Sequence, residues 1–209
     1  MNYAWARDFA LELINQYSVA GDPVLLSYNN QADYLARIPK LLDDAQNLVA
    51  TPVRRIRATM HVTVLSVEAK HDGWTVYKLP ADCWQISSAG LVRFTKAGMQ
   101  RFHRYHLIGR DHIALPDEVG TNMMLEYFRY PKLLGTAPKA DAELDNTTEV
   151  QMALPYYVAA HLVMYDNAFA YATLTNEWET KLERLYELPQ TELTVVEDAY
   201  SAEEWGAQG

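Results

Sequence analysis

The sequence predicts an α+β protein in which a small antiparallel β module, a sandwich or barrel, is inserted into a frame of four helices. Apolar residues recur at steps of three and four in the first fifty residues and again in residues 154–188, the spacing of one helix face. Between these segments the period changes to two, which is typical of strands. We therefore expect a helical domain of residues 1–52 and 135–189, a β module of residues 53–134 and an extended tail of residues 190–209.

Two helices are expected before the β module. The first covers about residues 3–18, and the second follows Asn30, whose side chain suits an N-cap, and ends at Thr51-Pro52. Pro39 falls inside the second pattern and should kink the helix or mark a restart. The apolar stripes are Trp5, Phe9, Leu13 and Tyr17 in the first helix, and Tyr34, Ile38, Leu41, Ala45 and Leu48 in the second.

About six strands are expected in the β module. Residues 55–65 alternate apolar with basic or polar side chains, as in a half-buried strand. Asp72-Gly73 stands before another alternating segment and predicts a hairpin turn. Shorter strands are expected at residues 91–95, 100–107, 112–115 and 122–130, and residues 134–146 are expected to be a polar linker back to the helices.

Residues 154–188 form the longest stretch with helical periodicity, and they carry two apolar stripes. At about 100° per residue, the stripes would lie roughly 140° apart around one straight helix. We therefore expect two helices separated at Asp166-Asn167, whose side chains favour caps and turns, with Pro155 near the start of the first helix. The stripes are Leu154, Val158, Leu162, Tyr165 and Phe169, and then Tyr171, Leu174, Trp178, Leu182 and Leu185.

The net charge of −9 is unevenly distributed along the 209 residues. Residues 54–132 hold 12 basic and 7 acidic residues, whereas the remainder holds 6 basic and 20 acidic residues. A single cysteine, Cys83, excludes an internal disulfide framework and suits a reducing cytoplasm. The chain has neither an apolar run of membrane-spanning length nor a signal-peptide pattern, so we expect no contact with a membrane.

No pattern in the sequence points to an enzyme, a metal site or a cofactor. Gly-rich phosphate loops and the GxSxG and HExxH motifs do not occur. His103 and His106 are three apart, a spacing that places strand residues on opposite faces, so they are expected at a surface or an interface. Asp43 and Asp44 diverge by about 100° on a helix and are expected to be two solvated acids.

Basic and aromatic side chains interleave between residues 101 and 110, where Arg101, Arg104 and Arg110 alternate with Phe102, Tyr105 and His106. This pattern is compatible with nucleic-acid contact. Arginines on one face of a hairpin more often form a solvated or inter-subunit salt-bridging face. Both interpretations remain open, and a small nucleic-acid-binding module that uses this basic face is the alternative function.

The tail contains apolar residues that a purely solubilising tail does not need. An extended segment can add itself to the sheet edge of a neighbour, and Trp205 would be its anchor. We expect this segment to bind a partner, with a disordered acidic end as the alternative. The candidate partner-binding residues are Leu193, Val195, Val196, Tyr200 and Trp205.

The helical frame carries more aromatic side chains than four short helices readily hide. We therefore expect some of them to form contacts between copies of the chain. The residues concerned are Trp5, Tyr17, Tyr156, Tyr157, Tyr171 and Trp178.

Taken in order, four segments resemble the head–tail adaptor (head-completion, connector) proteins of tailed bacteriophages. They are ALELINQYSVAG, DYLARIPKLLDDAQNLVA, FRYPKLL and, most strongly, LPYYVAAHLVMYDNAFAYATLTNEWETKLERL, and the resemblance covers about residues 4–188. Their order along the chain carries the resemblance, since none of them is a catalytic motif. Shorter adaptors have only a brief connection in place of the β module, so its role does not follow from the resemblance.

The resemblance implies a structural virion protein, made in the host cytoplasm, with no reaction and no cofactor. It would form a homo-oligomeric ring, usually a dodecamer, beneath the portal protein at the capsid vertex. The ring would extend the DNA channel and present a surface to the tail, a stopper or a tail-terminator protein. A mainly acidic ring would repel phosphate, so genomic DNA would pass nearby without specific binding.

Overall fold

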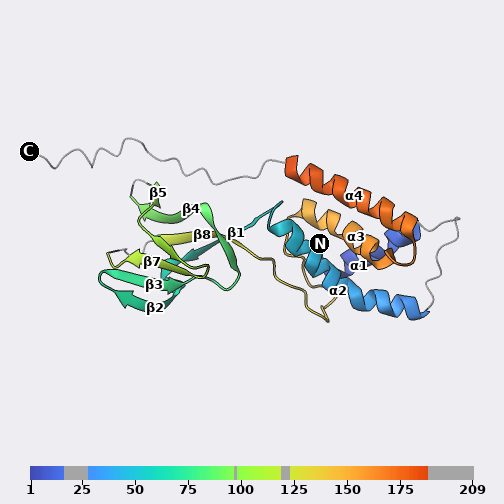
Figure 1. Cartoon of the computed structure of the whole chain (residues 1–209), viewed down its shortest axis with the longest axis horizontal. Coiled ribbons are helices and arrows are strands. Elements are labelled where there is room, and N and C mark those ends of the chain that lie inside the picture. The colour runs from blue at the N-terminus through green and yellow to red at the C-terminus, as the bar shows by residue number, and fades with distance from the viewer. Residues whose placement is uncertain (17–27, 97, 119–122, 188–209) are drawn as a thin grey trace, which may run out of the picture. The chain divides into compact units, whose positions relative to one another are not determined.

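The computed structural model describes residues 1–16, 28–96, 98–118 and 123–187, with only the backbone of residues 28–31. Over these residues the protein is a mixed α+β structure with four helices and two antiparallel four-stranded sheets. It divides into two compact units, which are described separately (Figure 1). The helical unit comprises residues 1–56 and 130–187 of the described chain, and the β unit comprises residues 57–129.

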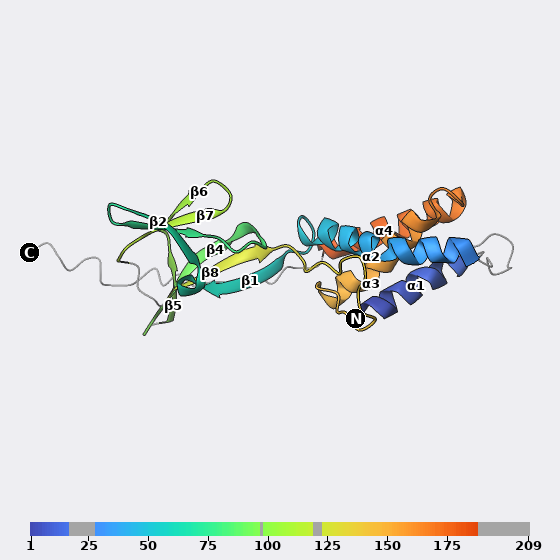
Figure 2. The same ribbon diagram turned by 90° about the horizontal axis from the view of Figure 1, so that it is seen from below.

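In the helical unit, one central helix contacts the three others. The helices are α1 (Tyr3–Gln16), α2 (Tyr28–Ala50), α3 (Thr148–Val163) and α4 (Ala168–Glu187). Figures 1 and 2 show α3 among the others, and it packs against α1, α2 and α4. Apolar side chains of all four helices form one continuous core. Because three helices pack around α3, most of its side chains are buried and its sequence is apolar on most sides.

Two predicted helix starts are wrong. Helix α2 begins at Tyr28, so Asn30 lies inside the helix and is not its N-cap. Helix α3 begins at Thr148, so Pro155 lies in its middle and is buried. Proline removes one helical hydrogen bond, but packing on several sides stabilises α3 despite this loss. Pro39 likewise lies within α2.

The buried faces of α1 and α2 differ from the predicted stripes. In α1 the small residues Ala6 and Ala10 are fully buried, whereas Trp5 and Phe9 are only partly buried. In α2, Leu42 and Val49 are buried, Leu41 is half-buried, and Leu48 is 52% exposed. Small side chains such as Ala6 and Ala10 let helices approach closely. The predicted stripes were chosen from large apolar residues, so they left these alanines out.

The predicted break in the last helical stretch is confirmed. Helix α3 ends at Val163 and α4 starts at Ala168. Asn167 caps α4, because its Oδ1 accepts a hydrogen bond from the Ala170 amide at 3.0 Å. The first predicted stripe ends at Leu162, and its last two members, Tyr165 and Phe169, are exposed.

The expected polar linker is an integral part of the helical unit. The amides of Tyr3 and Ala4 donate to the carbonyls of Ala142 and Ala140 at 2.8 and 3.0 Å. These bonds satisfy two amides at the N-terminus of α1 that have no partner within the helix. The side chain of Asn2 accepts from the Trp5 amide at 3.0 Å and completes this cap. Residues 140–142 therefore close the N-terminal end of α1.

The β unit contains two sheets, with strand orders β1-β8-β4-β5 and β2-β3-β7-β6. Figure 2 separates them, with β2, β6 and β7 on one side and β1, β4 and β8 on the other. The strands are β1 (Ile56–His61), β2 (Ser66–His71), β3 (Trp74–Lys78), β4 (Cys83–Thr95), β5 (Gly98–Phe102), β6 (His106–Ile108), β7 (His112–Pro116) and β8 (Met123–Arg129).

The eight strands exceed the six expected for two reasons. The predicted strand 100–107 is divided between β5 and β6, which belong to different sheets. The second additional strand is β2, for which no separate strand was predicted. The first half of β4, from Cys83, was also missed, which lengthens a predicted strand without adding one. The predicted strand 55–65 is shorter, since Val62–Val64 form a 3₁₀ turn and Val64 is exposed.

Both sheets contribute to one apolar core in the β unit. Ile113 and Leu115 of β7 join Leu91 of β4 and Leu125 of β8 in this core. The hairpin predicted at Asp72-Gly73 is confirmed, since His71 pairs with Trp74 across it. Both turn residues have positive φ, 22° and 82°, as a type I′ hairpin turn requires.

Within the described ranges, no helix combines the length and the apolar character needed to cross a membrane.

Candidate partner-binding surfaces

Buried polar side chains in the helical unit bind backbone groups of residues 130–147. The Asp43 carboxylate accepts from the amides of Leu134 and Gly135 at 2.7 and 3.1 Å. Asp43 is only 9% exposed, so its expected role as a solvated acid is wrong. Sequence spacing alone could not reveal this role, because the partners lie about ninety residues away.

Two glutamines act in the same way. Gln46 of α2 accepts from the Asp145 amide at 2.9 Å. Gln151 of α3 donates to the carbonyls of Leu144 and Asn146 at 2.8 and 2.6 Å. These bonds satisfy groups of the chain itself, so Asp43, Gln46 and Gln151 hold the segment between β8 and α3 in place.

The three arginines of the expected basic face lie on three different segments. Arg101 is on β5, Arg104 is in the loop after it, and Arg110 is in the turn between β6 and β7. Strand β5 pairs with β4 and β6 pairs with β7, so the three residues do not share one hairpin. Arg104 forms an ion pair with Glu118 at 3.1 Å, which offsets its charge.

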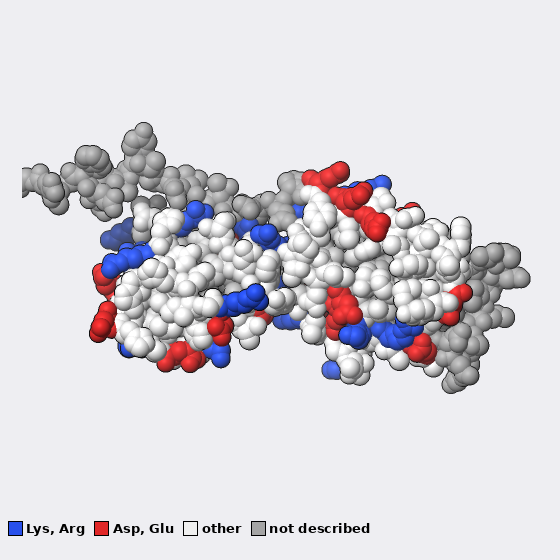
Figure 3. Space-filling view, in the orientation of Figure 1, with Lys and Arg blue, Asp and Glu red and all other residues white. Residues whose placement is uncertain are grey.

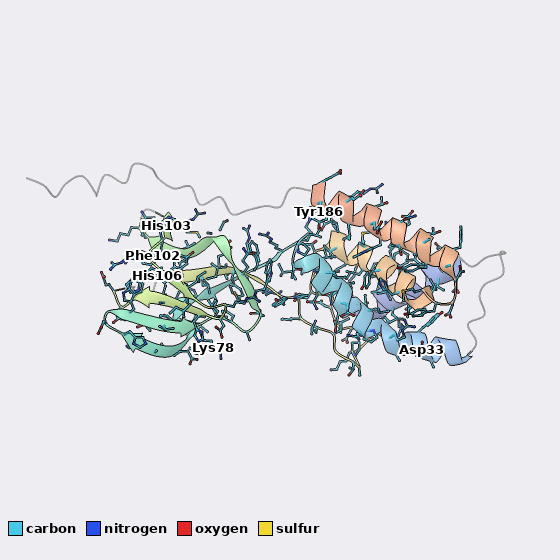
Figure 4. All side chains as sticks on the ribbon, viewed as in Figure 1. Asp33, Lys78, Phe102, His103, His106 and Tyr186 are labelled. Carbon is cyan, nitrogen blue, oxygen red and sulfur yellow. The ribbon has the colours of Figure 1, made fainter. Side chains whose placement is uncertain are left out.

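An aromatic and cationic cluster surrounds Trp74 of β3. The His106 ring lies 5.0 Å from the Trp74 ring, and the Arg104 guanidinium lies 6.0 Å from the same ring. Figure 4 labels His106, together with Phe102 and His103. A hollow of about 80 Å³ lies beside Arg104 and Phe102. That volume is too small for a cofactor, whose sites commonly exceed about 300 Å³.

The histidines, the acidic residues and Cys83 are the side chains that could bind a metal ion or act as a nucleophile. In the described part of the chain, no group of three His, Cys, Asp or Glu side chains is placed to hold a metal ion. His112 instead contacts Asp111 at 2.8 Å. Burial, and then the charge of Asp82, raise the pKa of the Cys83 thiol to about 11. Cys83 is therefore protonated at neutral pH and is a weak nucleophile.

Most of the aromatic side chains expected between copies are packed within the helical unit. The ring of Phe9 lies 5.5 Å from that of Trp5 and 5.8 Å from that of Tyr156. The rings of Tyr157 and Trp178 lie 5.4 Å apart. Trp178 is buried, and Trp5, Tyr156, Tyr157 and Tyr171 are partly buried against the core, while Tyr17 is outside the described residues.

The two most exposed aromatic side chains of the described residues lie instead where α3 gives way to α4. Tyr165 is 83% exposed and Phe169 is 67% exposed. The turn that carries them is fixed, because the Tyr34 hydroxyl donates to Asp166 at 2.6 Å. Burial, and then this hydrogen bond, raise the pKa of Tyr34 to about 12. The sequence contained this signal, since both residues lie in a predicted stripe that extends beyond the end of α3.

An open hollow of about 480 Å³ lies where the C-terminal half of α2 meets α3. Its lining consists of Asp44, Asn47, Leu48, Thr51 and Tyr157. The Tyr157 ring stacks on His161 at 3.9 Å, so it is held in place. Burial, and then the charge of Asp44, raise the pKa of Tyr157.

The five candidate partner-binding residues of the tail, Leu193, Val195, Val196, Tyr200 and Trp205, lie outside the described residues. No family model matches the chain, and no curated protein matches it.

Proposed function

We propose that the protein is a structural adaptor that forms a ring between the portal and the tail of a tailed bacteriophage. One observation supports this proposal above the others. Four segments resemble the adaptor family, and they supply parts of all four helices and of the segment that connects β8 to α3. They are residues 10–21, 33–50, 128–134 and 154–185. Their described residues contribute to one core around α3. Segments that resemble one family in order therefore also pack together in space.

In this proposal the four helices are the frame that builds the ring. The β unit, as a sandwich of two sheets inserted between α2 and α3, offers additional surface to the portal, the tail, a stopper or a tail-terminator protein. The tail residues from Leu193 to Trp205 attach the chain to the portal or to a neighbouring copy. Ring size, which we propose to be twelve copies by resemblance, is set by the portal.

The chemistry of the described residues supports an assembly role. Asp43, Gln46 and Gln151 bind backbone groups of the chain. The raised pKa of Cys83 disfavours the thiolate. Side chains that bind the backbone of their own chain stabilise the fold. A stable fold without an evident reactive group among these residues supports a role in assembly.

Localisation of the chain in purified virions tests the proposal. Gold-labelled antibody against the chain should bind at the single tail vertex of partially disrupted particles. Quantitative mass spectrometry should find as many copies of the chain as of the portal. Even labelling over the capsid shell would refute the adaptor function.

A nucleic-acid-binding module remains the second candidate, because Arg104 and His106 flank the Trp74 ring at the β-unit surface. Aromatic and cationic side chains together bind single-stranded nucleic acid. Under the adaptor proposal, gel-shift titration at physiological salt shows weak, salt-sensitive binding at most, further reduced when Arg101, Arg104 and Arg110 are replaced by Ser. Sequence-specific binding at nanomolar concentration would favour the second candidate.

A further inference from the structure

We infer that the outer face of the sheet β2-β3-β7-β6 binds single-stranded nucleic acid without sequence preference, and that protonation of its histidines strengthens the binding. This surface, named the Trp74 face, comprises His71, Trp74, Lys78, Arg104, His106 and His112. The inference builds on the second candidate function, to which it assigns a surface and a form of regulation. It does not depend on the ring.

The strand register shows that these side chains share one face. Paired residues of neighbouring strands point to the same side of a sheet, and Trp74 of β3 is paired with His71 of β2. Two residues further along β3, Val76 is paired with Ala114 of β7, which is paired in turn with His106 of β6. Since side chains alternate along a strand, Trp74 and Val76 point to the same side. Trp74 and both histidines therefore lie on one face.

The Trp74 face is turned away from the core of the β unit. Ile113 and Leu115, which flank Ala114 along β7, are fully buried members of that core. They point to the opposite side of the sheet from Ala114. On the Trp74 face, His71 and His106 are exposed and Trp74 is half-buried. The two histidines can therefore meet a ligand from solvent.

Cationic and aromatic side chains are grouped around Trp74. The His106 ring lies 5.0 Å from the Trp74 ring at an angle of 45°, and the Arg104 guanidinium lies 6.0 Å from the same ring. Ala114 lies on the strand between Trp74 and His106, and its small side chain leaves room for their approach. An aromatic side chain with cationic neighbours can stack on an unpaired base and bind the phosphate beside it.

Lys78 and His112 extend the cationic surface along the strands. They are paired with each other across β3 and β7, and Figure 4 labels Lys78 and His106 in the β unit. Lys78 is four residues from Trp74, about 13 Å along a strand. The four strands of the sheet span about 14 Å at their usual spacing. A surface of this size accommodates a few nucleotides of a single strand.

A single strand suits this surface better than a duplex does. In a duplex the bases stack on one another, so a side chain on a flat sheet meets only the sugar-phosphate backbone. Aromatic side chains on a sheet face bind bases that are unpaired. Figure 3 also shows acidic side chains gathered over the C-terminal half of α4, which makes that surface of the helical unit unfavourable to a polyanion.

The basic side chains of the Trp74 face are offset at neutral pH. Arg104 is paired with Glu118 at 3.1 Å. Lys78 is the strand neighbour of His112, whose ring contacts Asp111 at 2.8 Å. Two basic side chains thus stand beside two acidic ones, and binding at neutral pH is expected to be weak.

The charged residues around the face are nearly balanced as well. Lys70 precedes His71 on β2, and Arg110 lies in the turn between β6 and β7. Three acidic residues oppose them, Glu68 in the bulge of β2, Asp72 in the hairpin turn and Asp117 after β7. Protonation of the three histidines adds three positive charges and makes the whole surface positive. Histidine changes its charge between about pH 5 and 8, so the affinity for a polyanion should rise over this range.

Fluorescence anisotropy of a labelled oligothymidine, titrated with the full chain at constant salt, tests the inference. The dissociation constant should fall about ten-fold from about pH 8 to about pH 5.5, since each of three exposed ion pairs contributes a factor of about two. His71→Gln combined with His106→Gln should remove most of this change. The matched control is His61→Gln with His103→Gln, which removes two histidines from outside the face and should retain the change.

A second variant tests the stacking. Trp74→Ala should weaken binding about ten-fold at both pH values, as loss of base stacking does. Circular dichroism verifies that this variant is folded. If it is not, the histidine variants decide the inference, because exposed His71 and His106 can be replaced with little effect on the core.

Each outcome supports or overturns the inference. An equal pH effect in both histidine variants would show a general charge effect and overturn it, as would tighter binding of a duplex of the same length. Binding unchanged by Trp74→Ala in a folded chain would overturn this surface but retain the nucleic-acid-binding module. Absence of binding at pH 5.5 would overturn both. None of these results decides the adaptor function, which localisation in the virion tests separately.

Discussion

The two units of this protein bury polar groups in different ways. In the helical unit, Asp43, Gln46 and Gln151 bind backbone groups of a connecting segment far away in sequence. In the β unit, Glu126 is almost fully buried and faces the guanidinium of Arg57 at 3.5 Å. Backbone-bound side chains fix where the chain runs, whereas a buried ion pair contributes little net stability because desolvation opposes it.

The apolar cores of the two units also differ in size. The helical core draws on all four helices and on Leu144 of the connecting segment, and the β core is smaller. A larger core buries more apolar surface, so we expect the helical unit to be the more stable of the two. Hydrogen exchange measured by mass spectrometry reports the stability of each unit separately.

The largest expected effect is the loss of a side chain from the centre of the helical core. Leu154 of α3 is fully buried, so Leu154→Ala should lower the free energy of unfolding of the helical unit by about 2–5 kcal/mol. Met152 of the same helix is 53% exposed, and Met152→Ala should change that energy by less than about 0.5 kcal/mol. Urea denaturation followed by helical circular dichroism measures both. Similar costs for the two variants would contradict the central position of α3.

The second effect concerns the connecting segment. Asp43→Ala removes the acceptor for two buried amides and should destabilise the helical unit by about 1–3 kcal/mol. Asp44, whose side chain is 45% exposed, is the matched control and should cost less than about 0.5 kcal/mol when replaced by Ala. Exchange of the Leu134 and Gly135 amides should accelerate only in the first variant. Unchanged exchange there would mean that other contacts hold the segment.

A third effect tests the β unit. Gly90 has φ of +60°, and a Cβ atom there would lie 2.8 Å from the Tyr105 hydroxyl oxygen. Gly90→Ala should destabilise the β unit by about 1–2 kcal/mol through its backbone conformation alone, and further through this contact. Combined with Tyr105→Phe, which removes the oxygen, the same substitution should cost less. Equal costs in both backgrounds would show that the hydroxyl moves away freely.

The smallest effect is confined to alkaline pH. Burial and Asp166 raise the pKa of Tyr34 to about 12, and burial and Asp82 raise that of Tyr127 to about 12. A tyrosine has a pKa of about 10 in an unfolded chain. The contribution of each residue is therefore complete below pH 10 and is lost as pH rises through about 12. Tyr34→Phe should flatten the fall in melting temperature of the helical unit over this range, and Tyr127→Phe should do so in the β unit. An unaltered profile in both variants would contradict the assigned pKa directions.

The sequence predicted the existence of most elements but not which faces they bury. The Asp166-Asn167 break and the Asp72-Gly73 hairpin depend on local backbone chemistry, and both are confirmed. The roles of Ala6 and Leu48 depend on how closely helices approach, which no local pattern records. The chain between β5 and β6 likewise changes sheets, and the pairing partner of a strand is a property of the whole fold.

The candidate surfaces also include some features that local sequence indicates and others that only the whole fold determines. Tyr165 and Phe169 were assigned to an apolar helix face, but the helix ends before them and both side chains are exposed. The hollow beside Tyr157 could not be predicted, because its lining joins α2 to α3 across a hundred residues of sequence. Asp43 was assigned to solvent because its backbone partners lie equally far away.

Electron microscopy of the purified chain mixed with the portal protein that the adaptor account assigns as its partner tests the central claim most directly. The adaptor account predicts a closed ring of the chain, coaxial with the portal ring and present on one of its ends. Portal rings that remain bare at saturating concentrations of the chain would contradict the account.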